Sequence, residues 1–233
     1  MRFAVISDIH SNIQALTRAL ATIDERGADK IYCLGDIVGY GGNPNECVDL
    51  IRARAALCVL GNHDMAAVDP EHADYFSRPG RIAIEWTHSV LTQQNIEFLA
   101  SLPFVASTEV CTLVHASPLD PPLWQYVLSL QVAKPQFQAF STPICFIGHT
   151  HVPGICGEDL KTFVLKKGKR FLINVGSVGQ PRDGNPQLSF GFFDVEAWKY
   201  ENIRVTYDID KAAQAIRIQG LPSTLATRLY QGV

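Results

Sequence analysis

The first sixty residues alternate between short apolar runs and segments with helical spacing, and this alternation constrains the fold more than any other feature. The apolar runs occupy residues 3–7, 31–34 and 56–60. Between them, apolar residues recur three and four positions apart over about 13–27, and a second helical segment, with proline in its first turn, covers 44–54. This β-α-β-α-β order favours parallel strands joined by right-handed crossovers.

The rest of the chain is expected to add helices and a second sheet. The apolar runs after residue 162 are short, rich in Val, Ile and Phe, and separated by turn-forming residues, which favours antiparallel hairpins. The expected elements are helices over 79–88 and 92–101, strands over 110–114 and 144–147, short strands over 162–165, 170–175, 188–195 and 201–207, and helical structure from about 209 onward. No repeat or long linker interrupts the sequence, so we expect one α/β (α+β) domain over residues 1–233 with two sheets.

Composition restricts the partners and the compartment. With 47% hydrophobic residues, 18% charged residues and a net charge of −3, the chain resembles an ordinary globular protein. It has no basic block, so we expect no extended nucleic-acid surface, although a small nucleotide or phosphoester can still be a substrate. We expect no signal peptide and no membrane span, because no stretch approaches about 18 uncharged apolar residues. The six scattered cysteines indicate buried free thiols and a cytoplasmic protein. The oligomeric state stays open.

Residues that commonly bind metal ions, namely Asp, Asn or His, follow five of the expected strands. In an open α/β sheet, ligands bind beyond the carboxyl ends of the strands. A single Asp there commonly caps a helix, but five such ends with Asp-x-His and His-x-His pairs indicate a metal site with nitrogen and oxygen ligands, which suits Mn, Fe, Zn or Co. The residues at these ends are Asp8, His10, Asp36, Asn62, His63, Asp64, His115, His149 and His151. The other histidines, His72 and His88, are expected on helix surfaces.

The order and spacing of these residues resemble those of the calcineurin-like metallophosphoesterases. The motifs are Asp8-x-His10, Gly35-Asp36, Gly61-Asn62-His63-Asp64, His115 and Gly148-His149-x-His151. Residues 35–41 and 174–182 resemble more closely a small bacterial group related to diadenosine tetraphosphatases and YfcE-type phosphodiesterases. Val175 stands where that group commonly has proline, a difference that affects turn rigidity and no ligand. The resemblance implies a two-sheet mixed β-sandwich flanked by helices and a site for two metal ions.

The resemblance also implies the two ligand sets. One metal ion takes Asp8, His10, Asp36 and His151, and the other takes Asp36, Asn62, His115 and His149. Asp36 then bridges the two ions, because a carboxylate has two oxygens and an imidazole cannot bridge. Two cations lower the pKa of a shared water, which attacks phosphorus as hydroxide, and neutralise charge on the phosphoryl oxygens. Mn is the favoured metal, with Fe, Zn, Co and Ni as alternatives.

His63 and Asp64 are expected to be catalytic. By resemblance, Asn62 is a ligand while His63 points at the substrate, where it can protonate the leaving oxygen. Asp64 can hold the other nitrogen of the His63 ring and fix its tautomer. The alternative for Asp64 is that it caps the next helix.

Three further residues are candidates for substrate binding, each with a structural alternative. Asn12 can contact phosphate or can be the N-cap of a helix. Tyr40 precedes two glycines in a loop that can approach the substrate or can be a plain turn. Arg182 can bind phosphate or can form a salt bridge with Asp183. The aromatic residues at 124 and 126 are interpreted as local packing and not as a base-stacking site.

The expected function is hydrolysis of a phosphodiester or phosphoanhydride bond in a small nucleotide-like molecule. The alternatives are a phosphomonoesterase or protein phosphatase on the same metals, and a non-catalytic scaffold with this fold. The scaffold is disfavoured because loss of activity goes with loss of ligands, and every expected ligand is present.

Overall fold

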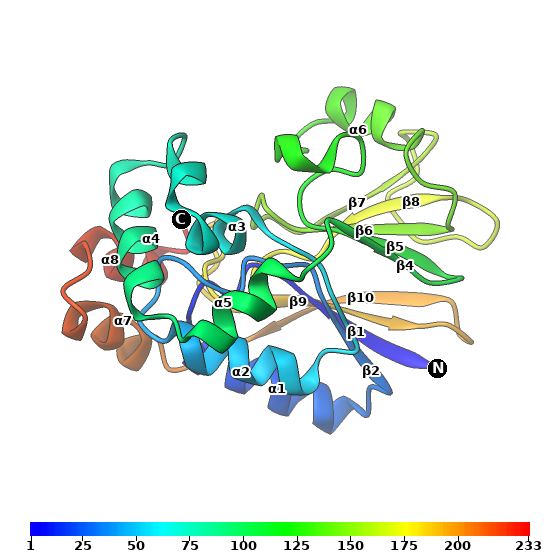
Figure 1. The fold of residues 1–233 in the computed structure, drawn as a ribbon. Helices are drawn as coiled ribbons and strands as arrows, with labels where there is room; N and C mark the ends of the chain where they lie inside the picture. Colours follow the sequence, from blue (N-terminus) through cyan, green and yellow to red (C-terminus); the bar gives the residue numbers. More distant parts are fainter.

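Two five-stranded sheets pack face to face in the computed structural model, which describes all residues 1–233 (Figure 1). The first sheet has the strand order β10-β9-β1-β2-β3, and the second has the order β4-β5-β6-β8-β7. The strands are β1 Arg2–Ile6, β2 Lys30–Cys33, β3 Leu57–Cys58, β4 Val105–Ser107, β5 Cys111–Val114, β6 Ile144–Ile147, β7 Gly154–Gly157, β8 Phe171–Asn174, β9 Leu188–Asp194 and β10 Lys199–Val205.

Helices cover the outer faces of this sandwich. Helices α1 and α2 lie under the first sheet, α6 lies over the second, and α4, α7 and α8 gather at one end (Figure 1). The helices are α1 Ile13–Arg26, α2 Pro44–Arg54, α3 Asn62–Val68, α4 Arg78–Val90, α5 Gln93–Ala100, α6 Leu130–Gln136, α7 Ile209–Ile218 and α8 Ser223–Gln231, with short 3₁₀ helices at Pro70–Ala73 and Pro121–Leu123. None of the helices combines the length and the apolar composition that a membrane crossing requires.

Both sheets are mixed. Strands β1, β2 and β3 are parallel, as the sequence predicts, and β9 joins the same sheet antiparallel to both β1 and β10. In the second sheet β5, β6 and β8 are parallel, while the edge strands β4 and β7 are antiparallel to their neighbours. The carboxyl ends of parallel strands meet at one edge of a sheet, so the fold brings the loops after β1, β2, β3, β5 and β6 together.

Successive side chains of β1 pack alternately against the second sheet and against the helices on the outer face of the first sheet. Phe3 and Val5 pack into the buried cluster between the two sheets, whereas Ala4 and Ile6 belong to the cluster that includes α1 and α2. Successive side chains of a strand point to opposite faces, so a strand that is covered on both sides is apolar throughout. This explains why the first strand reads as a continuous apolar run.

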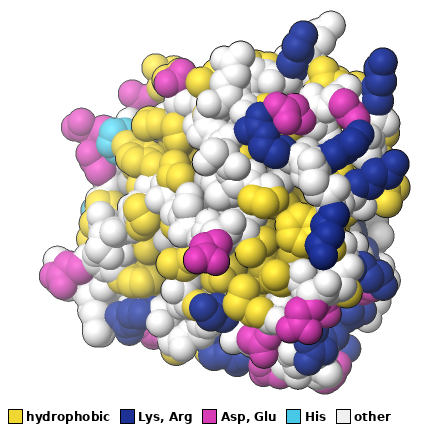
Figure 2. All heavy atoms as spheres, turned by 90° about the vertical axis from the view of Figure 1, so that its right-hand side faces the viewer, with side chains coloured by type: hydrophobic (Ala, Val, Ile, Leu, Met, Phe, Trp, Pro, Cys, Tyr) yellow, Lys and Arg dark blue, Asp and Glu magenta, His cyan; other side chains and the backbone are white.

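The end of the sandwich away from the loops that follow the parallel strands has a surface of mixed charge. On the face nearest the amino terminus, acidic and basic side chains are interspersed around apolar patches (Figure 2). This face lies at the start of β1, and the polar loops that follow the parallel strands lie at the other end of that strand.

The prediction of strands was wrong in four places. Residues 162–165 form no strand but part of the connection between β7 and β8, with Phe163 and Val164 exposed. The strands β4 and β7 were not predicted, because one has three residues and the other is Gly-Ile-Cys-Gly; both depend on pairing with a neighbouring strand. The strand expected over 56–60 is reduced to β3. All six cysteines are free, as expected; four are buried, while Cys58 and Cys156 are only half-buried.

Candidate metal centre

The loops after the strands hold the predicted ligands in an uncommon backbone conformation. Asp8, His10, Asp36, His149 and His151 all have positive φ, between 50° and 65°. Residues other than glycine seldom occupy this left-handed region, and when they do, they cluster at functional sites where the surrounding structure fixes them. The backbone is therefore arranged to aim these side chains at one place.

Two motif glycines allow the carboxylates to approach the backbone closely. A Cβ on Gly61 would lie 2.2 Å from Oδ1 of Asp36, and a Cβ on Gly148 would lie 2.5 Å from Oδ2 of Asp8. Both contacts are too short for any side chain. Glycine is therefore required at both positions.

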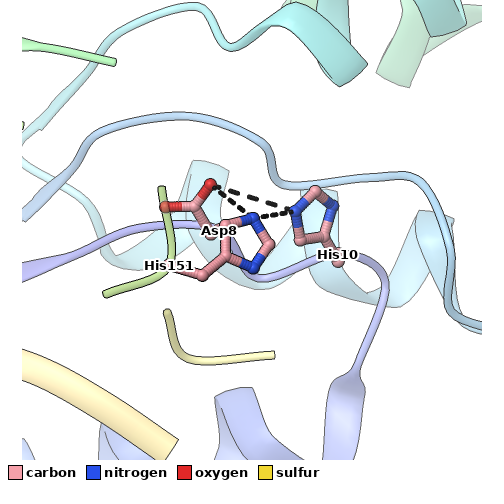
Figure 3. A group of neighbouring side chains, drawn as sticks. All are labelled: Asp8, His10 and His151. Carbon is pink, nitrogen blue, oxygen red and sulfur yellow. Dashed lines mark hydrogen bonds and ion pairs between the residues drawn. The ribbon is translucent and has the colours of Figure 1, made fainter. Parts of the chain in front are cut away.

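Asp8, His10 and His151 form the first group of ligand atoms (Figure 3). Nε2 of His151 lies 3.2 Å from Oδ1 of Asp8 and 3.1 Å from Nε2 of His10. Nε2 of His10 lies 3.9 Å from the same Asp8 oxygen. Donors that each lie about 2.1 Å from one cation are about 3–4 Å apart, so the three atoms fit a single ion.

Asp36, His115 and His149 form a second group. Nε2 of His115 lies 3.3 Å from Oδ2 of Asp36 and 3.2 Å from Nδ1 of His149. The same Asp36 oxygen lies 3.6 Å from Nε2 of His10, which belongs to the first group. The other oxygen, Oδ1, accepts a hydrogen bond of 2.8 Å from the backbone N–H of His63. Oδ2 of Asp36 is therefore the atom within reach of both groups.

Three of the histidines are oriented by backbone carbonyls. Nδ1 of His10 lies 3.1 Å from the carbonyl oxygen of Val38, and Nδ1 of His115 lies 2.8 Å from that of Leu34. Nδ1 of His151 faces a carbonyl oxygen in the same way. A carbonyl accepts only a proton, so Nδ1 carries it and Nε2 keeps its lone pair for a cation, as in most metal-binding histidines.

Buried polar atoms without hydrogen-bond partners indicate where cations would bind. Oδ1 of Asp8 and Oδ1 of Asn62 are buried and unpartnered. Each such atom costs about 1–3 kcal/mol when it stays unsatisfied. Both belong to predicted ligands, and a cation accepted by them would remove the cost. The residues therefore fit two divalent ions with mixed nitrogen and oxygen ligands.

The charges around the centre favour the ligand forms of most side chains. Burial raises the pKa of a carboxyl, yet the neighbouring imidazoles outweigh it and hold the pKa values of Asp8 and Asp36 below their usual range. Burial lowers the pKa of His149 to about 3 and also lowers that of His10. His115 differs: burial opposes its charged form, but the Asp36 carboxylate raises its pKa to about 9. A cation at His115 therefore competes with a proton for Nε2.

His63 lies beside the centre at the start of α3. Its ring packs against the rings of His10, Tyr40 and Phe76, with centroid distances of 4.7, 4.4 and 4.4 Å. Nδ1 is buried without a partner, and burial lowers the pKa of His63 to about 4. One ligand atom of His63 also lies within 4.8 Å of those of His10 and Asp36. Its expected role as a catalytic group and not a ligand stays a prediction.

The expected hydrogen bond between Asp64 and His63 is wrong. Oδ1 of Asp64 accepts hydrogen bonds from the backbone N–H groups of Ile37 (2.8 Å) and Val38 (3.1 Å), and Oδ2 accepts one from Gly61 (3.2 Å). The alternative that Asp64 caps the next helix holds in part: Gly61 is the N-cap residue of α3, and Asp64, at the third helical position, accepts from the Gly61 backbone N–H as in a capping box. Its carboxylate also joins the start of α3 to the loop after Asp36.

The structural alternative holds for Asn12. Oδ1 accepts from the backbone N–H of Ala15, so Asn12 is the N-cap of α1. Its amide donates to the carbonyl oxygen of Gly179 at 2.9 Å and to the hydroxyl of Tyr207 at 3.4 Å. Both amide protons are thus used inside the protein, which argues against the expected contact between Asn12 and substrate.

Tyr40 and Arg182 lie together beside the centre. The Tyr40 ring is 4.7 Å from that of His10, and the Arg182 guanidinium donates to the side chain of Gln180 at 3.0 Å. The alternative of a salt bridge to Asp183 is wrong, because Asp183 pairs with Arg204. Arg182 is therefore free of acidic partners and can take an anion.

Other aromatic and cationic residues adjoin the predicted set. Tyr126 stacks on the ring of His149 at 4.1 Å, so its local packing is against a predicted ligand. Phe76 and Arg228, near His63 and Tyr40, were not predicted, because a phenylalanine before a helix and an arginine on an amphipathic helix carry no local signal of a site. His72 and His88 are exposed on helices, as expected.

Comparison with known proteins identifies the class to which this site belongs. Residues 1–197 match the family described as the calcineurin-like phosphoesterase superfamily domain. The chain therefore belongs to this superfamily and is a metal-dependent phosphoric ester hydrolase. The fold class and the family predicted from the sequence are both confirmed.

Relatives of the chain include proteins from archaea and bacteria. The chain is 44% identical over 240 residues to an uncharacterized protein of Methanocaldococcus jannaschii, and the alignment covers 98% of this chain and 97% of that protein. A crystal structure of a metallophosphoesterase from Sphaerobacter thermophilus is 40% identical with a TM-score of 0.89, covering 100% and 99%. A hypothetical protein from Pyrococcus horikoshii shares the fold at 21% identity and a TM-score of 0.83, covering 100% and 98%.

Proposed function

We propose that the protein hydrolyses phosphodiester or phosphoanhydride bonds of a small nucleotide-like substrate at a centre of two divalent metal ions. The observation that carries this proposal is the position of Oδ2 of Asp36, which lies 3.6 Å from Nε2 of His10 and 3.3 Å from Nε2 of His115. One oxygen within reach of both ligand groups suits a bridge between two ions. The motif resemblance to diadenosine tetraphosphatases supports the substrate class.

In this proposal, the metal ions supply the Lewis-acid chemistry and the protein supplies their ligands. Two bound divalent ions activate water and neutralise negative charge on the phosphoryl oxygens. Asp8 and Asn62 would hold them with their unpartnered oxygens, and His149 with Nδ1, which lies 3.2 Å from Nε2 of His115. The nitrogen and oxygen donor set suits Mn²⁺, which we propose as the metal, and the free cysteines fit a reducing, cytoplasmic compartment.

His63 and Arg182 act on the substrate. The His63 ring is packed on three sides, so it cannot turn away, and it donates a proton to the leaving oxygen. Burial lowers its pKa in the free protein, and the negative charge of a bound phosphoryl group raises it again. Arg182, without an acidic partner, holds the phosphoryl oxygens.

Paired chromogenic esters test the proposal. We expect the protein with added Mn²⁺ to hydrolyse bis-p-nitrophenyl phosphate faster than p-nitrophenyl phosphate, and we expect chelation to abolish both activities until Mn²⁺ is restored. Faster hydrolysis of the monoester would favour a phosphomonoesterase. Hydrolysis of neither ester, at any metal supplied, would contradict an enzymatic role.

A further inference from the structure

The ring of Tyr40 is flanked by two arginines. The guanidinium carbon of Arg182 lies 5.8 Å from the ring centroid, and that of Arg228 lies 5.9 Å from it. The same ring contacts His10 and His63. Tyr40 therefore connects the metal centre to a pair of cations, with Arg182 nearer the centre, since its backbone N–H lies 3.4 Å from the carbonyl oxygen of His151.

Neither arginine has an acidic side chain as a partner. Arg182 bonds to Gln180 and lies 3.5 Å from the Tyr40 hydroxyl, while its Nε is buried and unpartnered. Arg228 uses only Nε, which donates to a main-chain oxygen of Val233, the last residue of the sequence, and both terminal nitrogens have no partner. Most arginines elsewhere in the chain form ion pairs; these are Arg18, Arg26, Arg52, Arg54, Arg81, Arg170 and Arg204.

The two positive charges oppose each other. Partial burial and the charge of Arg182 both lower the pKa of Arg228. Two cations that share a partly buried place, with no acidic side chain paired to either, are unfavourable, and an anion bound by both removes the repulsion. Guanidinium groups match the oxygens of phosphate with paired hydrogen bonds, so phosphate is the anion that this geometry suits.

The space beside Arg228 can hold a polar group. Arg228 lines a cavity of about 430 Å³ between the start of α4 and α8. The polar side chains around it are neutral hydroxyls and an amide: Ser77, Ser223, Thr224, Thr227 and Gln231. No acidic side chain lines this cavity. It can therefore accept negative charge that is bound to Arg228, although Tyr40 and Arg182 do not line it.

We propose that Arg228, with Arg182, binds a second phosphate of the substrate, so that the substrate is a phosphoanhydride carrying at least one phosphate beyond the one attacked. This inference rests on the proposed function and narrows its substrate class. Arg228 belongs to α8, outside the residues 1–197 that match the superfamily. The superfamily region thus carries the metal centre, and the C-terminal helix adds the specificity for a polyphosphate.

A matched pair of substrates tests this proposal. The p-nitrophenyl esters of thymidine 5′-monophosphate and of thymidine 5′-triphosphate share the nucleoside and the aryl group and differ in the number of phosphates. We expect kcat/KM to favour the triphosphate ester, and Arg228→Gln to reduce this preference roughly 10- to 100-fold, mainly through KM, the scale of one charged hydrogen-bond contact. Products are followed by chromatography, because more than one bond of the triphosphate can break.

Two further variants keep the test specific. Arg217→Gln removes a charge from the neighbouring helix α7 and should keep the preference. Arg228→Lys keeps the charge without the paired hydrogen bonds, so it should recover part of the preference for the triphosphate ester. This variant also keeps the test conclusive if the Arg228→Gln protein fails to fold. A wild-type protein that cleaves neither ester contradicts the proposed function itself. A wild-type protein that cleaves both, with a preference unchanged in Arg228→Gln, overturns this inference alone.

Binding supplies a readout without turnover. Calorimetry of the metal-free protein with inorganic tripolyphosphate should give a dissociation constant roughly 10-fold larger for Arg228→Gln than for wild type or Arg217→Gln. Equal affinities in all three proteins would overturn the proposal.

Discussion

The ligand cluster and the group around Tyr40 lie side by side but are built in different ways. The ligand cluster comes from strand ends of both sheets, with side chains that are almost all buried and rings oriented by backbone carbonyls. Arg182 and Arg228 come from a loop and from α8, are only partly buried, and have no acidic partners. The cluster is therefore fixed for holding cations, whereas the arginines keep hydrogen-bonding capacity for a ligand.

The strongest way to separate ligands from substrate-facing groups is to compare two histidines. His63→Ala should keep the metal content and the fold, while turnover falls roughly 10²–10⁴-fold, the usual effect of removing a positioned acid. The loss should be smallest for a p-nitrophenyl ester, which leaves without protonation, and larger for an alkyl ester.

His115→Ala is the matched control for this comparison. It removes a predicted ligand, so it should strip or loosen a metal ion and reduce turnover on both esters alike. Metal analysis of both variants decides the result. If His63→Ala loses metal as His115→Ala does, His63 is a ligand and its proposed role is wrong.

A smaller effect is expected where Asp64 supports the cluster. Asp64→Ala leaves the backbone N–H groups of Ile37, Val38 and Gly61 without their acceptor. We expect the free energy of unfolding to fall by more than about 1–3 kcal/mol, which is the cost of a single unsatisfied buried group. Chemical denaturation checks this value. Asp74→Ala, which breaks an exposed ion pair with Arg81, should cost about 0–1 kcal/mol, and an equal loss in both variants would contradict the assigned role of Asp64.

The sequence could predict the ligand cluster because its signals are local. A short apolar run followed by Asp or His reports both a strand and its carboxyl end, and the parallel topology then brings the ends together. The same local reasoning missed β7, since Gly-Ile-Cys-Gly forms a strand only through its pairing with β8. It also assigned Asp64 to the adjacent His63, whereas its partners at residues 37 and 38 lie far back in the sequence.

Of the two arginines around Tyr40, the sequence predicted Arg182 but not Arg228. Arg182 is the last residue of the stretch 174–182 that resembles the small bacterial group, so the sequence indicates it. Arg228 reaches the Tyr40 ring only because α7 and α8 return to the metal end of the sandwich (Figure 1). A long-range contact of this kind leaves no periodic or local pattern in the sequence.

The metal content of wild type and of Asp36→Asn tests the central claim most directly. Both proteins are purified with Mn²⁺ and analysed by plasma mass spectrometry against protein concentration. The account predicts about two ions per wild-type chain and the loss of both together in Asp36→Asn, because one carboxylate oxygen lies within reach of both ligand groups. A single ion in wild type, or one ion fully retained in Asp36→Asn, would contradict the bridged centre.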